Sequence, residues 1–237
     1  MTSRNRRITQ AVDVKRRAKE APQDPGEHCL VAGCGRLTGR ASQRGLSINY
    51  CRTHSEALRA HGHLTAKSYD RGALLPYRIA ARKWLLLHGE KRAVKDAVIE
   101  MDWLIETAGR AASANVMRSS PPKEKARIVL ARIRDANKTG RQLLEVVLVS
   151  LAIVQDKGPR GAPEFRYVQT AKLAKRLRGA SGTHIKSAVW GDTSRYPKAQ
   201  GAYLRILGQR LEDTVRTLLE NGAVEEVLAL VNTRSRA

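Results

Sequence analysis

Aromatic side chains are so scarce in this chain that its core has to be built almost without them. Phe, Trp and Tyr together make up 4% of the 237 residues, and there is a single Phe. Sheets favour aromatic and β-branched residues, whereas Leu and Ala are strong helix formers. The composition therefore predicts a mostly α-helical protein.

Apolar residues that recur with a period of 3.6 predict where the helices lie. The expected helical stretches are residues 52–61, 74–87, 91–112, a segment that begins at Pro122, 141–155, 167–177, 183–190 and the apolar end 201–231. Within 74–87 we expect an inward face made of Leu75, Ile79, Trp84 and Leu87. Trp84 and Trp103 are interpreted as core residues and not as stacking platforms, and residues 113–121 as a linker.

No segment has the pattern of a membrane anchor or a secretory signal. The longest apolar run, Leu143 to Val154, has 12 residues and includes Glu145. It is too short to cross a bilayer and is interpreted as a buried core helix. The basic start of the chain is not followed by an apolar stretch. We expect a cytoplasmic, nucleoid-associated protein.

Positive charge dominates the chain. Lys and Arg number 44 against 22 Asp and Glu, for a net charge of +22. In a compact protein, so many positive side chains repel one another. A polyanion usually neutralises them, most commonly the phosphate backbone of a nucleic acid. The stretch from Lys157 to Lys198 has 10 basic and 2 acidic residues, while residues 201–237 are neutral on balance. The charge therefore predicts a nucleic-acid partner, DNA in the first place.

All three cysteines fall close together and are followed by a histidine. They form the pattern Cys29-x4-Cys34-x16-Cys51-x2-His54. Zinc prefers four tetrahedral nitrogen and sulfur ligands, and closely spaced pairs present two ligands to one ion. We therefore predict a structural zinc site. His28 and His61 are alternative fourth ligands, but His54 fits the spacing best.

The second half of this element is similar to a known zinc knuckle. Cys51-Arg-Thr-His54-Ser-Glu-Ala-Leu-Arg59-Ala-His61-Gly62 resembles the Cys-x2-His-Tyr-x-Arg-x6-Gly knuckle of small bacteriophage and mobile-element proteins, with Ser55 in place of the Tyr. The resemblance covers residues 27–66. It implies a structural zinc and a DNA-processing setting, because such knuckles often accompany nucleases of the His-Asn-His type.

An enzymatic alternative follows from that resemblance. His61 and His63 would hold a catalytic metal in a nuclease or recombinase component. No Asp-His dipeptide and no suitably spaced Asn and His follow the pair. We therefore expect that the protein is not itself the enzyme, and that Gly62 ends the knuckle helix.

The basic stretch near the C-terminus has the outline of a helix-turn-helix. The amphipathic helix 167–177 precedes the sequence Gly179-Ala-Ser-Gly182, and Thr183 would cap a second helix. The expected nucleic-acid contacts are Arg52, Arg59, Lys172, Lys175, Arg176, Arg178, Thr183, His184, Lys186 and Ser187, together with the basic residues between Arg4 and Lys19. Lys172, Lys175 and Arg176 are expected to point outward from their helix.

These patterns divide the chain into five segments. They are a basic arm (1–26), the zinc knuckle (27–66), a helical domain (70–156), the helix-turn-helix-like module (157–198) and a leucine-striped end (199–237). The last segment suits an intramolecular cap or a homodimer seam. The predicted function is a zinc-containing DNA-binding accessory or regulatory protein of a phage or mobile element. An RNA-binding subunit of a ribonucleoprotein assembly is the third reading.

Overall fold

The computed structural model describes residues 28–38, 48–177, 183–185, 193–195 and 201–234. The basic arm predicted for residues 1–26 lies outside this part of the chain. The chain divides into two compact units, Met1–Leu58 and Arg59–Ala237, and each is described by itself.

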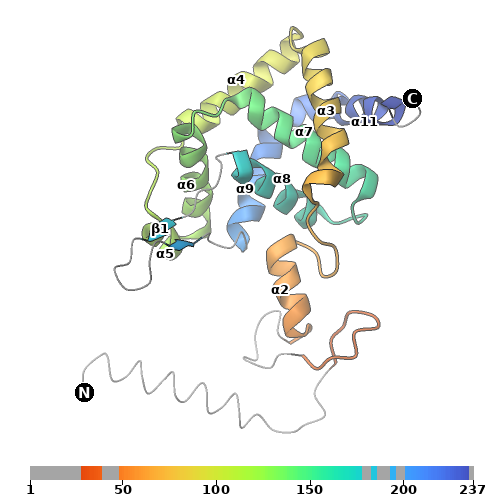
Figure 1. The fold of residues 1–237 in the computed structure, drawn as a ribbon, viewed down its shortest axis with the longest axis vertical. Coiled ribbons are helices and arrows are strands. Elements are labelled where there is room, and N and C mark those ends of the chain that lie inside the picture. Colours follow the sequence, from red (N-terminus) through yellow and green to blue (C-terminus); the bar gives the residue numbers. More distant parts are fainter. Residues whose placement is uncertain (1–27, 39–47, 178–182, 186–192, 196–200, 235–237) are drawn as a thin grey trace. The chain divides into compact units, whose positions relative to one another are not determined.

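The described chain is mostly helical, as its composition predicts (Figure 1). The helices are α2 (Arg52–His61), α3 (Arg71–His88), α4 (Arg92–Glu106), α5 (Ala114–Ser119), α6 (Pro122–Asp135), α7 (Gly140–Lys157), α8 (Pro163–Leu177), α9 (Ala202–Thr214), α10 (Arg216–Glu220) and α11 (Ala223–Arg234). Two short strands, β1 (Thr183–Ile185) and β2 (Thr193–Arg195), pair antiparallel.

Side chains at the helix ends explain where several helices begin. Asp70 caps α3 by accepting a hydrogen bond of 2.8 Å from the backbone N–H of Ala73. Thr139 and Gln142 form a reciprocal capping box at the start of α7. Pro122 occupies the first turn of α6, where its missing N–H costs nothing. Helices α2, α4, α6, α7 and α9 begin within one residue of the predicted positions, whereas α3 and α8 begin three and four residues earlier than predicted.

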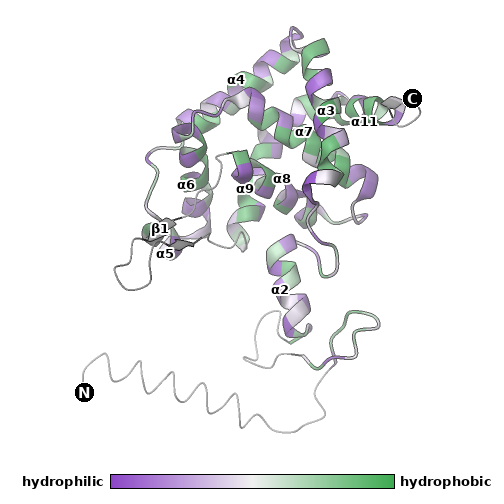
Figure 2. Cartoon of the chain, in the orientation of Figure 1, coloured by the Kyte–Doolittle hydropathy of each residue, from purple (hydrophilic) through white to green (hydrophobic). Residues whose placement is uncertain are grey.

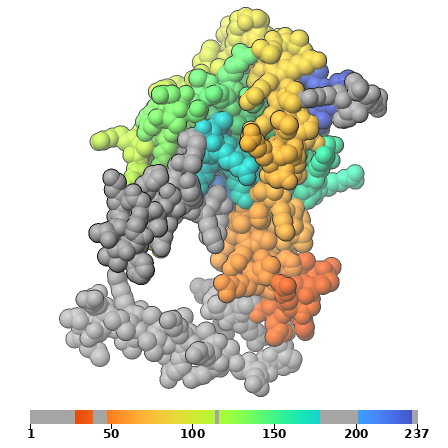
Figure 3. Space-filling model, viewed as in Figure 1, coloured from red at the N-terminus to blue at the C-terminus, as the bar shows by residue number. Residues whose placement is uncertain are grey.

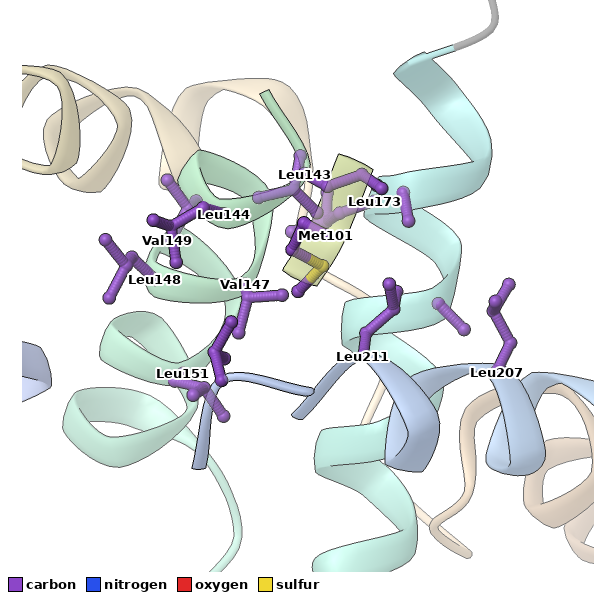
Figure 4. Close-up of a cluster of buried hydrophobic side chains, with 14 of the residues drawn as sticks. Met101, Leu143, Leu144, Val147, Leu148, Val149, Leu151, Leu173, Leu207 and Leu211 are labelled. Carbon is purple, nitrogen blue, oxygen red and sulfur yellow. The ribbon is translucent and has the colours of Figure 1, made fainter. Parts of the chain in front are cut away.

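Helix α7 forms the centre of the second unit (Figure 1), and 11 of its 18 residues are buried. The apolar run predicted as a buried core helix is therefore confirmed, and Figure 2 shows α7 as hydrophobic along most of its length. Figure 4 shows Val147 of α7 on the side that faces Met101 of α4 and Leu211 of α9, while Leu148 and Val149 lie on the other side of the helix. Among the described residues, no helix is both long enough and apolar enough to span a membrane.

The leucine-striped end of the chain packs within the same unit. Leu204, Leu207 and Leu211 of α9 and Val227 of α11 are fully buried in the common core. Helix α9 lies against α8 and α6, and α11 lies against α3 and α7. These apolar residues are thus covered by the chain's own helices.

The inward face expected for the first long helix is right at Trp84 but wrong at Leu75 and Leu87. Leu75 and Leu87 are 54% and 63% exposed, and Leu74, Tyr77 and Leu85 are buried in their place. Both sets of residues have helical spacing, so periodicity alone does not distinguish the two faces. The contacts of α3 with α7 and α11 select the face that contains Leu74.

Two further expectations for the middle of the chain need correction. Trp84 is buried, as predicted, and its Nε1 donates a 2.5 Å hydrogen bond to Glu226. Trp103 is 65% exposed and does not belong to the core. The segment 113–121, predicted as a linker, contains the short helix α5, which Ser113 caps through the N–H of Val116. The sequence around Ser113 is rich in residues that favour loops, so the helix that this serine caps could not be distinguished from a linker.

The second helix of the predicted helix-turn-helix does not begin at Thr183. Residues Thr183–Ile185 form β1, which pairs with Thr193–Arg195. Thr and Ile are β-branched and prefer the extended backbone of a strand. The β-branched Thr193 opposite Ile185 fits the same preference. A helical recognition element starting at this position is therefore excluded.

A buried polar network joins α7, α8 and α9. Glu212 of α9 accepts hydrogen bonds from Arg166 Nε (2.8 Å) and Thr170 Oγ1 (3.2 Å), and Thr170 also contacts Ser150 Oγ at 3.0 Å. Burial raises the pKa of Glu212 to about 7, although Arg166 and Thr170 act to lower it. Burial of the charged carboxylate therefore costs free energy of folding, and this cost depends on the pH because it applies only when Glu212 is deprotonated.

Gly208 allows α8 and α9 to cross closely. A Cβ atom at position 208 would lie 1.9 Å from the backbone oxygen of Tyr167. Because this atom belongs to the backbone of α8, it cannot swing away as a flexible side chain would. The closeness of the two helices thus depends on the absence of a side chain at this position.

Replacement of Gly208 by Ala is therefore expected to destabilise the protein by about 3 kcal/mol or more, since the helices must separate. Urea denaturation followed by tryptophan fluorescence measures the effect. Gly72→Ala is the matched control, because its Cβ would meet only Asp70 Oδ1 at 3.4 Å. The control should stay within about 1 kcal/mol of the parent protein. Equal effects of the two changes would contradict the close crossing.

Stability should also fall as the pH rises through the pKa of Glu212. The folded protein binds this proton more tightly than the unfolded chain, whose glutamate pKa is about 4.5. The stabilisation is complete below pH 4.5 and is lost as the pH passes about 7. In the variant Glu212→Gln, the free energy of unfolding should fall by about 2–3 kcal/mol less between pH 5 and 8 than it does in the parent protein. All three Trp residues follow Arg59, so their fluorescence reports on the second unit alone.

Candidate functional site

A short hairpin presents the first two cysteines. An antiparallel bridge joins His28 and Leu37, and the backbone N–H of Cys29 donates to the oxygen of Arg36 at 2.8 Å. Cys34 donates its N–H to the oxygen of Val31 (3.0 Å) at the tip. Gly33 and Gly35 have φ values of +74° and +56°, which glycine adopts without strain. The tight turn that the two glycines permit brings Cys34 back towards Cys29.

The start of helix α2 presents the other two candidate ligands, Cys51 and His54. Cys51 directly precedes the helix and accepts the N–H of Ser55 at its backbone oxygen (2.9 Å). His54 lies three residues later, so that both side chains project from the same face of the first turn. Arg36 of the hairpin donates to Thr53 Oγ1 at 2.8 Å and ties the two elements together. The helix predicted for residues 52–61 has these bounds in the structure.

The four side chains converge on one point. Cys29, Cys34, Cys51 and His54 have ligand atoms that all lie within 4.8 Å of one another. Two thiols, Cys29 and Cys51, lie 3.2 Å and 3.4 Å from His54 Nδ1, and Cys34 Sγ lies 3.8 Å from Cys51 Sγ. A tetrahedron with metal–sulfur bonds of about 2.3 Å has sulfur–sulfur edges of about 3.8 Å. The cluster therefore has the spacing to hold a metal ion.

The environment of Cys51 favours its thiolate form. The backbone N–H of His54 is the main reason that the pKa of Cys51 lies below its ordinary value. Metal ligation by cysteine requires the deprotonated sulfur. For Cys34 the backbone hydrogen bond from Arg36 lowers the pKa, but burial and the neighbouring thiols outweigh it and raise the pKa. Crowded sulfur atoms of this kind are stabilised when a cation lies between them.

The other histidines near this element have different partners. His28 Nδ1 contacts the backbone oxygen of Gly35 at 3.3 Å, and His61 Nδ1 lies 3.0 Å from Ser68 Oγ. His63 Nδ1 accepts the N–H groups of Thr65 and Ala66. Within the described residues, the Cys/His cluster is the single group of three or more His, Cys, Asp or Glu that could hold a metal. His61 and His63 belong to no such group of three or more in the described chain.

The residues predicted to contact nucleic acid differ in their exposure and in their hydrogen-bond partners. Arg52, Arg59 and Arg176 are exposed, and Arg52 pairs with Glu56 one turn away. Lys175 donates to the hydroxyl of Tyr203 at 3.3 Å. Thr183 and His184 belong to β1. Arg178, Lys186 and Ser187 lie outside the described residues.

Lys172 does not point outward, contrary to the sequence-based expectation. It is half-buried, and its Nζ donates to Ser68 Oγ at 2.8 Å and lies 3.2 Å from His61 Nδ1. The pattern of α8 suggested one inward face, but the helix is buried on several sides because α7, α9 and the residues before α3 surround it. Ser68, Tyr69 and Gln169 were not identified from the sequence, since isolated polar residues in a loop or helix give no spacing signal.

A cavity of about 610 Å³ lies beside Glu212 in the second unit. Apolar side chains such as Leu151 and Val224 form part of its wall. Charged residues of both signs line the remainder: Arg160, Arg166, Arg216, Glu212, Glu220 and Glu225. Positive and negative groups are present in equal number, so the cavity does not select a charge class of ligand.

Comparison with protein-family models, curated proteins and solved structures finds no match to this chain. The site is therefore interpreted from its own geometry.

Metal binding is expected at one ion per chain. Cys51→Ser should lower the affinity for zinc by at least about tenfold, because a thiolate ligand is lost. His28→Asn is the matched control and should bind the metal as the parent protein does. Cobalt substitution, followed through its thiolate absorption bands, measures both variants.

Removal of the metal with a chelator should unfold the region around residues 28–58 and leave tryptophan fluorescence unchanged, since every Trp lies in the second unit. Purified protein that contains far less than one zinc per chain would contradict the site, as would a cooperative loss of the whole fold on chelation.

Proposed function

We propose that this chain is a zinc-stapled DNA-binding protein that acts as an accessory or regulatory factor of a phage, plasmid or transposon. The observation that carries the proposal is the net charge of +22. The Cys/His cluster and the knuckle resemblance support the setting. In such a role the protein would act in the cytoplasm, on the nucleoid.

The ligand set favours zinc as the metal. Three thiolates and one imidazole form a soft, four-coordinate set, which suits Zn²⁺ and disfavours the hard cations Mg²⁺ and Ca²⁺. All four positions are supplied by protein side chains, a feature of structural and not of catalytic zinc sites. The metal would replace the hydrophobic core that so short a hairpin and helix cannot build.

Part of the positive charge is used inside the fold. Arg127, Arg132 and Arg134 of α6 donate to backbone oxygens of the segment 106–112, as in the 2.7 Å bond from Arg132 to Ala112. Arg166 pairs with buried Glu212. These cations are accounted for by folding and give no evidence for a partner.

Many other cations face solvent. Exposed basic side chains occur on both units: Arg36, Arg52, Arg59, Lys67, Arg71, Lys83, Arg118, Lys123, Arg160, Arg176 and Arg210. Their mutual repulsion is relieved when a polyanion binds, and release of the counterions of that polyanion favours the complex. A nucleic-acid backbone is the intracellular polyanion that meets this requirement most directly.

The main test is binding to labelled nucleic acid over a range of salt concentrations. We expect association with duplex DNA whose logarithm falls steeply with the logarithm of salt concentration, by about 0.9 for each phosphate neutralised. Fluorescence anisotropy with duplex DNA, single-stranded DNA and RNA measures the preference. A salt slope near zero for all three would overturn the proposal, and a clear preference for RNA would favour the ribonucleoprotein alternative.

The nuclease alternative has its own test. Incubation with plasmid DNA and Mg²⁺ or Mn²⁺ should leave the DNA intact. Cleavage that disappears in the double variant His61→Ala and His63→Ala would show instead that the chain is the enzyme.

A further inference from the structure

Exposed large apolar side chains of the second unit gather on two helices. Apart from Val116 of α5, those that the described part of this unit exposes all belong to α3 or α4: Leu75, Ile79, Leu86, Leu87, Ile99 and Trp103. Figure 3 shows both helices at the surface, α3 in gold and α4 in yellow. Single exposed apolar residues are common on proteins, whereas several that share neighbouring helix turns mark an interaction surface.

The exposed side of α3 is apolar along its centre and basic at its edges. Leu75, Ile79 and Leu86 are separated by four and seven residues, so they form one row along the helix. Arg71 precedes the row by one turn and Lys83 lies beside it, and both cations are exposed. Neither has an ion pair among the described residues. We call these five residues the α3 face.

The exposed side of α4 is also apolar along its centre, but its edges are acidic. Ile99 and Trp103 lie one turn apart, and the exposed side chains of Glu100 and Glu106 flank them. In the described chain, neither of these two carboxylates has an ion pair. We call these four residues the α4 face.

The basic residues at the start of α4 do not cancel this negative charge. Arg92 pairs with Asp96 at 2.8 Å, and Lys95 pairs with Glu90 at 2.7 Å. Both cations are therefore neutralised by the helix itself or by the turn before it. The α4 face keeps its negative charge in a chain whose net charge is +22.

A hollow beside Ile99 allows the α4 face to receive an apolar side chain. Its volume is about 350 Å³, and Leu85, Val94 and Val98 line it together with Ile99. The other lining residues are Gly89, Glu90, Lys95 and Arg141. Protein interfaces are commonly anchored by a large side chain that fills such a pocket. Leu86, which is 77% exposed, projects from the α3 face and is suited to this role.

We propose that the α3 face of one copy of this chain binds the α4 face of a second copy, with Leu86 in the hollow beside Ile99. Charge decides between the alternative pairings. Two α3 faces would bring the cations of both copies together, and two α4 faces would oppose their glutamates. The pairing of α3 with α4 joins opposite charges and covers both apolar rows.

This contact differs from the homodimer seam predicted for residues 199–237. The leucines of that segment are covered by the chain's own helices, whereas the α3 and α4 faces are exposed. Two short helix faces form a small interface, which is typical of weak association. We expect a Kd between about 1 μM and 1 mM. The inference goes beyond the proposed function and does not depend on nucleic-acid binding.

Sedimentation velocity over a series of protein concentrations, after nuclease treatment, measures the self-association. The parent protein should shift from monomer to a larger species as its concentration rises. Leu86→Glu should weaken association at least about tenfold, because it removes the anchor and places a carboxylate against the acidic α4 face. Trp103→Lys should do the same by placing a cation against the α3 face. Val116→Glu changes an exposed apolar residue elsewhere and should have no effect.

A mixture of the two variants identifies which faces meet. Leu86→Glu retains an intact α4 face, and Trp103→Lys retains an intact α3 face, so the contact can still form between the two proteins. An equimolar mixture should therefore associate about tenfold more strongly than either variant alone. A contact between two α3 faces would instead be lost in Leu86→Glu and kept in Trp103→Lys.

Charge reversal tests the electrostatic part of the contact. Lys83→Glu leaves the apolar row of α3 intact and should weaken association several-fold. Lys123→Glu makes the same change of charge at an exposed position of α6 and should leave association unchanged. Equal effects of the two reversals would contradict the charge complementarity on which the pairing rests.

The remaining outcomes are equally decisive. A parent protein that stays monomeric at 1 mM, about the upper limit of the expected Kd, overturns the inference. Association that Leu86→Glu and Trp103→Lys both leave within twofold of the parent value overturns it too, as does a mixture that shows no recovery. Circular dichroism establishes that each variant is folded. Because no nucleic acid is present, this inference and the proposed function can fail independently of each other.

Discussion

Helix α7 has little solvent-facing surface along most of its length, so several other helices must cover it at once. Helices α3, α4, α8 and α11 all contact it. The approach of α4 is so close that a Cβ at Gly140 would lie 2.3 Å from the backbone oxygen of Val98. Burying this aliphatic helix supplies much of the hydrophobic free energy of the second unit, and the positions of the surrounding helices follow from it.

In its described residues, the first unit lacks a hydrophobic core of this kind. The described part of Met1–Leu58 buries few large apolar side chains, and Leu30 and Leu37 are 69% and 58% exposed. A hairpin and a helix of this size cannot exclude enough water to fold by apolar burial alone. The four converging side chains of Cys29, Cys34, Cys51 and His54 could hold a metal ion, and a bound ion would contribute the missing free energy of folding.

Basic residues in this chain fall into two groups, those that make hydrogen bonds or ion pairs within the fold and those that are exposed to solvent. The arginines of α6 bind backbone oxygens and stabilise the loop before α5, whereas others remain on the surface. Lys172 belongs to the first group, because it is half-buried and donates a hydrogen bond to Ser68 Oγ. A count of charges along the sequence does not distinguish these cases. Burial and hydrogen-bond partners, which only the folded structure provides, do distinguish them.

The features of this protein that its sequence predicts correctly are those that depend on local patterns. The helix that starts at Arg52 and the buried run in α7 depend on neighbours a few residues away, and each ligand pair, Cys29 with Cys34 and Cys51 with His54, is closely spaced in the chain. The strand at Thr183 was missed because a glycine-flanked segment resembled a helix-turn-helix. The choice of the Leu74 face over the Leu75 face depends on which helices pack against α3, and this information is not local.

The amino-acid sequence by itself determined the helical class, the excess of positive charge and the four candidate metal ligands, because composition and short-range spacing suffice for each. The tertiary structure decided which side of each helix is buried, and it joined Ser68 and Tyr69 to Gln169 and Lys172 although about a hundred positions separate them in the chain. Contacts of that kind form only when α8 packs against the residues before α3, so no periodicity along the chain reveals them.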